Sequence, residues 1–135
     1  MTDDAMLDNT IANDASAQTM AIILAAGRGS RMQSDQPKVL LPALGRPLVT
    51  HVIDALLMAG IQKIILVVGY QQELVKAELK GYSNLTFVTQ QEQLGTGHAV
   101  QMCVTQLKQH TGPVIIVTGD SPLIQPQSIK SLLAE

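Results

Sequence analysis

The chain has 135 residues and a formal net charge of −2 at pH 7; 46% of its residues are hydrophobic and 2% are aromatic. This length suits one modest domain with an aliphatic core. No apolar run approaches the roughly 20 residues that span a bilayer, and there is no basic patch with interleaved aromatic residues. We therefore expect neither a membrane nor a nucleic acid as a partner. A small anionic ligand that is held by a few local groups is compatible with the charge balance.

The first 19 residues contain four aspartates and no basic residue. A secretory signal would need a positive start and a long apolar stretch. We expect residues 1–19 to be a disordered leader, with a short docked helix as the alternative, and residues 20–135 to be the N-terminal part of a larger domain. The single cysteine, Cys103, cannot form an internal disulfide, which fits a reducing, cytoplasmic location. We expect Cys103 to be buried in the core and not to act as a nucleophile.

Four short aliphatic runs are typical of buried parallel strands: residues 21–25, 63–68, 85–89 and 114–118. Helical patterns lie between them at residues 47–59, 71–80 and 97–108, and another apparent helix follows residue 124. Strands that alternate with helices predict right-handed βαβ units. The expected fold class is therefore α/β, a Rossmann-like three-layer α/β/α arrangement with a mostly parallel sheet.

The first loop, LAAGRGSRMQSDQPK at residues 24–38, follows the first expected strand. Gly27 and Gly29 permit a close approach that side chains would block, and successive backbone N–H groups can form an anion-binding nest. Arg31 offers a planar fork of donors to a phosphate, and Lys38 offers a mobile point charge. The Walker A pattern and the third glycine of a dinucleotide fingerprint are missing. The alternative is a Gly-rich connection whose basic residues are merely solvated.

The segment QQEQLGTGHA, residues 90–99, follows the third expected strand. The amide of Gln90 can present both a donor and an acceptor to the edge of a base, and Gly95 and Thr96 supply exposed backbone groups for the remaining polar edge. The alternative is a turn followed by a helix start. We expect His98 to be explained by helix packing and not by catalysis.

The segment VTGDSPLI, residues 117–124, ends the fourth expected strand with an aspartate. Asp120 is a candidate hard oxygen ligand for Mg²⁺, which is commonly held by one or two carboxylates together with substrate phosphates. The alternative is that its carboxylate caps the following turn. His51 and His110 have no partner at metal-ligand spacing.

Together, the motifs LAAGRGSRM, PKVLL, EQLGTGHA and GDSPLI resemble those of the sugar-nucleotide pyrophosphorylases, and EQLGTGHA is most similar to the members that act on N-acetylglucosamine 1-phosphate. The resemblance implies the nucleotide-binding half of a nucleotide-diphospho-sugar transferase fold. It also implies a reaction in which UTP and N-acetylglucosamine 1-phosphate give UDP-N-acetylglucosamine and pyrophosphate, with Mg²⁺, for peptidoglycan and lipopolysaccharide precursors. Another nucleotidyltransferase of this fold and a non-catalytic nucleotide-binding module are the alternatives.

The resemblance also implies roles for particular residues. It gives Arg31 and Lys38 the catalytic role of holding phosphates, and it makes Asp120 the metal ligand. Because the sugar phosphate itself attacks the α-phosphorus in this family, positioning and charge neutralisation take the place of a protein nucleophile. Sugar-binding residues and a second metal ligand are implied beyond residue 135, so we expect low activity from this chain alone, and a homotrimeric parent assembled through a β-helix. The residues implied at the nucleotide are Leu24, Ala25, Ala26, Gly27, Lys38, Gln90, Gly95, Thr96, Thr118 and Gly119.

Overall fold

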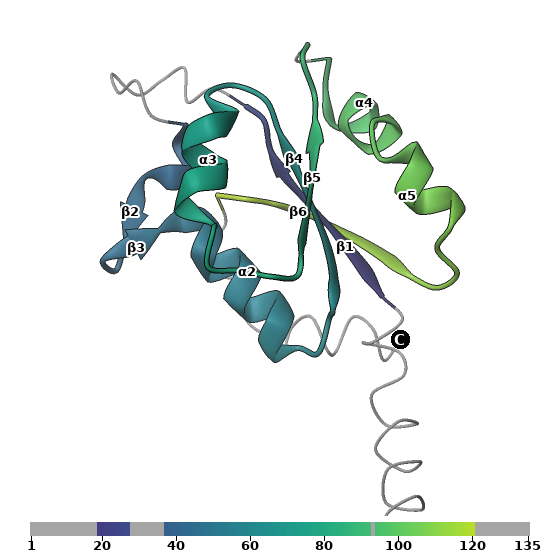
Figure 1. Cartoon of the computed structure of the whole chain (residues 1–135), viewed down its shortest axis with the longest axis horizontal. Helices are drawn as coiled ribbons and strands as arrows, with labels where there is room; N and C mark the ends of the chain where they lie inside the picture. Colours follow the sequence, from purple (N-terminus) through teal and green to yellow (C-terminus); the bar gives the residue numbers. More distant parts are fainter. Residues whose placement is uncertain (1–18, 28–36, 93, 121–135) are drawn as a thin grey trace, which may run out of the picture.

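A computed structural model describes residues 19–27, 37–92 and 94–120. Within these ranges, four strands form a parallel sheet in the order β5-β4-β1-β6 (Figure 1). The strands are β1 (Met20–Ala25), β4 (Lys63–Val68), β5 (Leu85–Thr89) and β6 (Val114–Thr118). Three of them have the bounds that the aliphatic runs predict, and β1 begins one residue earlier. Residues 1–18, Gly29, Arg31 and the expected helix after residue 124 lie outside the described residues.

Helices cover both faces of the sheet (Figure 1). On one face lie α2 (Leu48–Met58) and α3 (Gln72–Glu78), and on the other lie α4 (Thr96–Gln101) and α5 (Val104–Lys108). The parallel order and the two helical layers confirm the α/β fold class expected from the sequence. No helix in the described ranges is long and apolar enough to cross a membrane.

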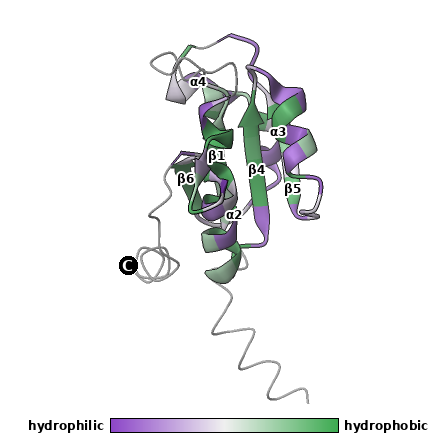
Figure 2. Cartoon of the chain, turned by 90° about the vertical axis from the view of Figure 1, so that its left-hand side faces the viewer, coloured by the Kyte–Doolittle hydropathy of each residue, from purple (hydrophilic) through white to green (hydrophobic). Residues whose placement is uncertain are grey.

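The core is divided by the sheet because neighbouring residues of a strand face opposite sides. In β1, Ala21 and Ile23 belong to the cluster that packs under α2 and α3, while Ile22 belongs to the cluster under α4 and α5. Strand β4 repeats this division, with Leu66 on the first side and Val67 on the second. Both strands are therefore buried on both faces, which explains why they are hydrophobic along most of their length (Figure 2).

The segment between the first loop and α2 was not predicted as regular structure. It forms the 3₁₀ helix η1 (Lys38–Leu40) and a two-stranded antiparallel hairpin, β2 (Pro42–Ala43) and β3 (Arg46–Pro47). Leu44 and Gly45 make the hairpin turn with positive φ angles of 54° and 82°. Strands of two residues carry too little periodicity to be recognised in a sequence.

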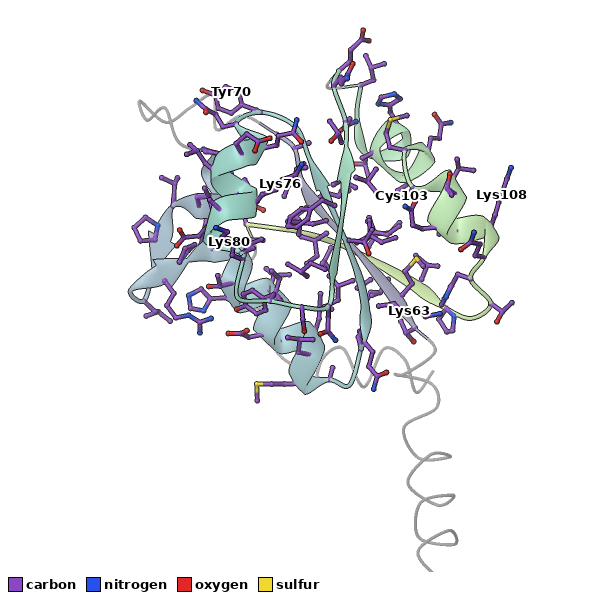
Figure 3. All side chains as sticks on the ribbon, viewed as in Figure 1. Lys63, Tyr70, Lys76, Lys80, Cys103 and Lys108 are labelled. Carbon is purple, nitrogen blue, oxygen red and sulfur yellow. The ribbon has the colours of Figure 1, made fainter. Side chains whose placement is uncertain are left out.

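The prediction of a single helix at residues 97–108 is wrong, because the structure has two short helices there, α4 and α5. The thiol of Cys103 donates to the carbonyl of Ala99 at 3.6 Å, and this is the oxygen that the Cys103 N–H would use in a continuous helix. That N–H instead donates to Val100 O at 2.9 Å, which tightens the chain into a turn. The cysteine itself is fully buried, as expected, and burial raises the pKa of its thiol. Figure 3 shows its side chain on the sheet side of this turn.

Candidate functional site

A cavity of about 370 Å³ lies at the carboxyl ends of the strands. The chain runs outward from β1 through β4 to β5 and then returns to place β6 on the other side of β1. This change of direction opens a crevice at the ends of β1 and β6, where open α/β sheets bind ligands. The cavity is lined by Leu24, Ala26, Gly27, Lys38, Val39, Val67, Gln90, Gly95, Thr96, Ala99, Thr118 and Asp120.

One part of the cavity wall is charged. The Lys38 ammonium lies 3.0 Å from carboxylate Oδ2 of Asp120, and both side chains remain partly exposed, at 49% and 30%. Residue 38 opens η1, and residue 120 follows the end of β6, so the ion pair joins the segments that flank the crevice. A partly exposed cation and a partly exposed carboxylate can each exchange this partner for a charged ligand.

Asp120 is held in its ionised form. Burial alone would raise the pKa of this carboxyl group, but hydrogen bonds from Lys38 and Thr118 and the charge of Lys38 outweigh it, so the pKa lies below its usual value of 3.8. An ionised carboxylate at the edge of a cavity is a suitable hard ligand for a divalent cation. The described residues contain no group of three or more His, Cys, Asp and Glu side chains that could enclose a metal ion. Among the residues that line the cavity, Asp120 is the one that carries a carboxylate.

Gly119 fixes the backbone next to Asp120. Its N–H donates to Leu24 O at 2.9 Å, which joins the ends of β6 and β1. A Cβ at residue 119 would lie 2.9 Å from Val39 Cγ1 and 3.2 Å from Leu24 O. Only glycine allows β6 to approach β1 and Val39 this closely, and this approach determines the position of Asp120 at the end of β6. At Gly27, by contrast, a Cβ would meet no atom of the described residues within 4 Å, and its φ is not positive, so these residues do not require glycine at this position.

The opposite part of the wall is uncharged and polar. Gln90 directly follows β5, is 3% exposed, and donates its backbone N–H to Val68 O at 2.7 Å. Its side-chain Nε2 lies 3.3 Å from Gly95 O and 2.9 Å from His98 Nδ1. Gly95 has a φ of 101°, which disfavours any other residue, and precedes the first turn of α4. The burial of Gln90 and these two contacts hold its amide in a defined position.

Most of the residues expected at a nucleotide meet in this cavity. Ala25 and Gly119 are the exceptions, since they are buried beside the cavity and not in its wall. Arg31 lies outside the described residues. The sequence reasoning did not identify three apolar residues of the wall, Val39, Val67 and Ala99. It also explained His98 by helix packing alone, although the imidazole contacts Gln90. The spacing of eight residues between Gln90 and His98 gives no periodic signal that could have indicated the contact.

A parallel sheet with a partly charged, partly polar cavity at its switch point defines an α/β domain with a ligand-binding crevice. Its sequence matches the model of the MobA-like NTP transferase domain over residues 21–135, and the chain belongs to this family. It is also similar to "Bifunctional protein GlmU" of Geobacillus sp. (strain WCH70), with 50% identity over 113 residues, which are 84% of this chain and 24% of that protein. The chain thus spans about a quarter of the length of this curated relative.

Solved structures support the same fold. Rv0371c from Mycobacterium tuberculosis H37Rv superposes with a TM-score of 0.73 and 23% identity, over 88% of this chain and 60% of that one. A second structure of that protein, in complex with manganese, gives a TM-score of 0.68 and 22% identity, over 87% and 58% of the two chains. These likenesses, together with the family, confirm the nucleotidyltransferase fold expected from the sequence motifs.

Proposed function

We propose that this chain is the nucleotide-binding part of a uridylyltransferase, which joins UTP to N-acetylglucosamine 1-phosphate and releases pyrophosphate. The observation that carries the proposal is the composition of one cavity wall. A cation and an ionised carboxylate, Lys38 and Asp120, share that wall with a buried amide, Gln90. Charged groups of this kind suit a metal-bound triphosphate, and an amide suits the edge of a base. The NTP transferase family and the motif EQLGTGHA favour this nucleotide and this acceptor.

Lys38 binds phosphate oxygens of the nucleotide, and Arg31 is the second cation of the same loop. The side chain of Lys38 is half exposed and already stands at the cavity wall, so it reaches a ligand without a change of fold. A charge-assisted hydrogen bond of this type contributes about 1.5–3 kcal/mol. These cations hold the triphosphate so that its α-phosphorus faces the attacking sugar phosphate.

Asp120 holds Mg²⁺, whose bound charge would neutralise and orient the triphosphate. The donor set fits this ion, because the carboxylate is ionised and Mg²⁺ accepts one protein carboxylate when phosphates and waters complete its shell. The backbone of Gly119 keeps Asp120 close to the end of β1, so a metal held by Asp120 would be near the edge of the sheet at which Lys38 stands. Thr118 supports this arrangement through its hydrogen bond to the carboxylate.

The protein supplies no nucleophile in this proposal. The phosphate of the sugar substrate is already an anion and attacks in line, so the chain contributes alignment and charge neutralisation. Gln90, Gly95 and Thr96 hold the base while Lys38 and Asp120 hold the phosphates. Fixing both ends of the nucleotide limits its motion relative to the incoming phosphate, which is where the rate enhancement arises.

The proposal is tested by calorimetry of the chain with UTP, CTP, GTP and dTTP in the presence of Mg²⁺, together with an assay of pyrophosphate release. We expect UTP to bind most tightly, and pyrophosphate release to be slow but dependent on N-acetylglucosamine 1-phosphate. Asp120→Asn should abolish most of the Mg²⁺-dependent release while some UTP binding persists. Tighter binding of another nucleotide would identify a different transferase of this fold. Binding of UTP without any pyrophosphate release by the full-length parent would identify a nucleotide-binding module.

A further inference from the structure

The side-chain amide of Gln90 meets two protein groups, and their chemistry determines which way the amide is turned. The group at the Nε2 position lies 3.3 Å from the carbonyl oxygen of Gly95 and 2.9 Å from Nδ1 of His98. An amide oxygen and an amide nitrogen can be exchanged by a half-turn, and a histidine can carry its proton on either nitrogen. The His98 contact alone would therefore be compatible with both orientations of Gln90.

The carbonyl of Gly95 removes this ambiguity. A backbone carbonyl oxygen only accepts hydrogen bonds, so the group that faces it must be the NH₂ of Gln90. That NH₂ also faces His98 Nδ1, which must then be the unprotonated, accepting nitrogen of the imidazole. In this arrangement the proton of the His98 imidazole lies on Nε2. The two amide protons of Gln90 have one acceptor each, Gly95 O and His98 Nδ1.

The two acceptors do not hold the amide equally. The distance of 2.9 Å to His98 Nδ1 is the ordinary length of a good hydrogen bond, whereas 3.3 Å to Gly95 O is longer than usual. The Gly95 carbonyl is also shared, because it accepts the N–H of Ala99 at 3.1 Å in the first turn of α4. His98 is therefore the stronger of the two partners, and its loss would leave the orientation of Gln90 weakly determined.

We propose that His98 is a positioning residue that sets the base preference of the cavity through Gln90. With both N–H groups directed at Gly95 and His98, Gln90 offers a base its carbonyl oxygen Oε1. Uracil has a donor at N3, which Oε1 accepts, whereas cytosine has a lone pair at N3, which Oε1 repels. A rotated amide would reverse this preference. The inference rests on the proposed function only in taking Gln90 as the residue that meets the base.

Two substitutions at residue 98 separate positioning from simple packing. His98→Leu fills space but has no acceptor. His98→Asn is smaller, yet its Oδ1 stands at the same number of bonds from the backbone as Nδ1 and can accept the same proton. A purely structural role predicts more damage from Asn than from Leu, because Leu restores more of the buried volume. The matched control is His110→Asn, since His110 lies near the start of β6, at the other end of that strand from the cavity.

The first measurement needs no nucleotide. Nitrogen-15 NMR of the ligand-free chain reports the protonation of each imidazole nitrogen and the resonance of the Gln90 amide. We expect His98 Nδ1 to be unprotonated, and the Gln90 resonance to shift in His98→Leu but not in His110→Asn. A proton on Nδ1 of His98 would overturn the inference at this stage.

The second measurement is the ratio of the UTP and CTP dissociation constants for each variant. We expect His98→Leu to lose about tenfold of the preference for UTP, the effect of one ordinary hydrogen bond. We expect His98→Asn to retain most of the preference and His110→Asn to retain all of it. An unchanged ratio in His98→Leu, or a larger loss in Asn than in Leu, would overturn the positioning role. Absence of any UTP preference in the unaltered chain would instead refute the proposed function, and the NMR result would still decide the hydrogen bond.

Discussion

The ammonium of Lys38 and the carboxylate of Asp120 are 3.0 Å apart and pair with each other across the mouth of the crevice between β1 and β6. Each group therefore neutralises the other in the ligand-free chain. If a nucleotide and a divalent cation bind here, Lys38 must turn to phosphate and Asp120 must turn to the metal. In the ligand-free chain the ion pair holds both charged groups at the mouth of the crevice, where each remains partly exposed.

The first prediction concerns Lys38→Met, which keeps an unbranched side chain one atom shorter and removes its charge. We expect UTP affinity to fall by about 10- to 100-fold, because one charge-assisted phosphate contact is lost. Binding of Mn²⁺ without nucleotide should not weaken, because the ammonium that competes for Asp120 is gone. Calorimetry measures the first effect and electron paramagnetic resonance the second. Lys80→Met is the control, since Lys80 is exposed and lies at the end of α3 (Figure 3). Equal UTP affinity in Lys38→Met and Lys80→Met would contradict the assignment.

The second prediction concerns the stability of the chain in acid. The pKa of Asp120 is lowered in the folded chain, so its ionisation stabilises the fold above about pH 3.8, and this contribution is lost as the pH falls through the lower folded value. Because the side chain is partly exposed, the contribution is small, about 1 kcal/mol or less. Urea unfolding should show Asp120→Asn to be less stable than the parent at neutral pH. The difference should shrink as the pH falls below 3.8 and the carboxyl group is protonated, and a difference that grows in acid would show that the sign is wrong.

The sequence was sufficient for the strands and for the gathering of site residues because both depend on short-range patterns. An aliphatic run such as residues 63–68 is buried on both faces of a parallel sheet, and the residues that follow such runs meet at one edge. The division of the expected helix at residues 97–108 is a local turn in which the Cys103 N–H donates to Val100 O, and the hydrophobic periodicity runs on through it without a signal. The contact between Gln90 and His98 likewise spans a turn in which Gly95 has a positive φ of 101°, and this turn has no periodic pattern in the sequence.

The third prediction tests the close approach at Gly119. We expect Gly119→Ala to lower the free energy of unfolding by about 1–3 kcal/mol, because its Cβ would crowd the side chain of Val39 and the carbonyl of Leu24. UTP affinity should fall as well, since Asp120 shifts with its neighbour. Gly81→Ala is the control, as a Cβ there meets nothing within 4 Å. Urea unfolding of both variants decides the matter. Similar stabilities for the two alanine variants would mean that β6 and β1 accommodate the methyl group.

The fourth prediction concerns a polar cluster that joins the hairpin to α2. Tyr82 donates to Asp54 Oδ1 at 2.8 Å, and Arg46 pairs with the same carboxylate. Desolvation, together with the hydrogen bond to Asp54, raises the pKa of Tyr82 above its usual value of 10.0. Tyr82→Phe removes one hydrogen bond and should lower the free energy of unfolding by about 0.5–1.5 kcal/mol.

None of these three residues lines the cavity, so UTP affinity should not change in Tyr82→Phe. A spectrophotometric titration of the folded chain should also show a tyrosine that ionises above pH 10.0, and this transition should be missing from the variant. Loss of UTP binding in Tyr82→Phe would mean that the cluster is coupled to the site, contrary to its position.

The last prediction concerns Gln90→Ala, which removes the amide and leaves the rest of the wall in place. The substitution should reduce the preference for UTP over CTP by about tenfold or more, because a buried polar edge left unpaired costs about 1–3 kcal/mol. Binding of inorganic triphosphate, which has no base, should be unchanged, since Lys38 and Asp120 remain. The variant should also be less stable, because Gly95 O and His98 Nδ1 lose their common donor. The control for this prediction is Gln109→Ala, because Gln109 is exposed and directly follows α5. Competition calorimetry with UTP, CTP and triphosphate distinguishes the two ends of the ligand, and a variant that keeps its full UTP preference would show that Gln90 does not contact the base.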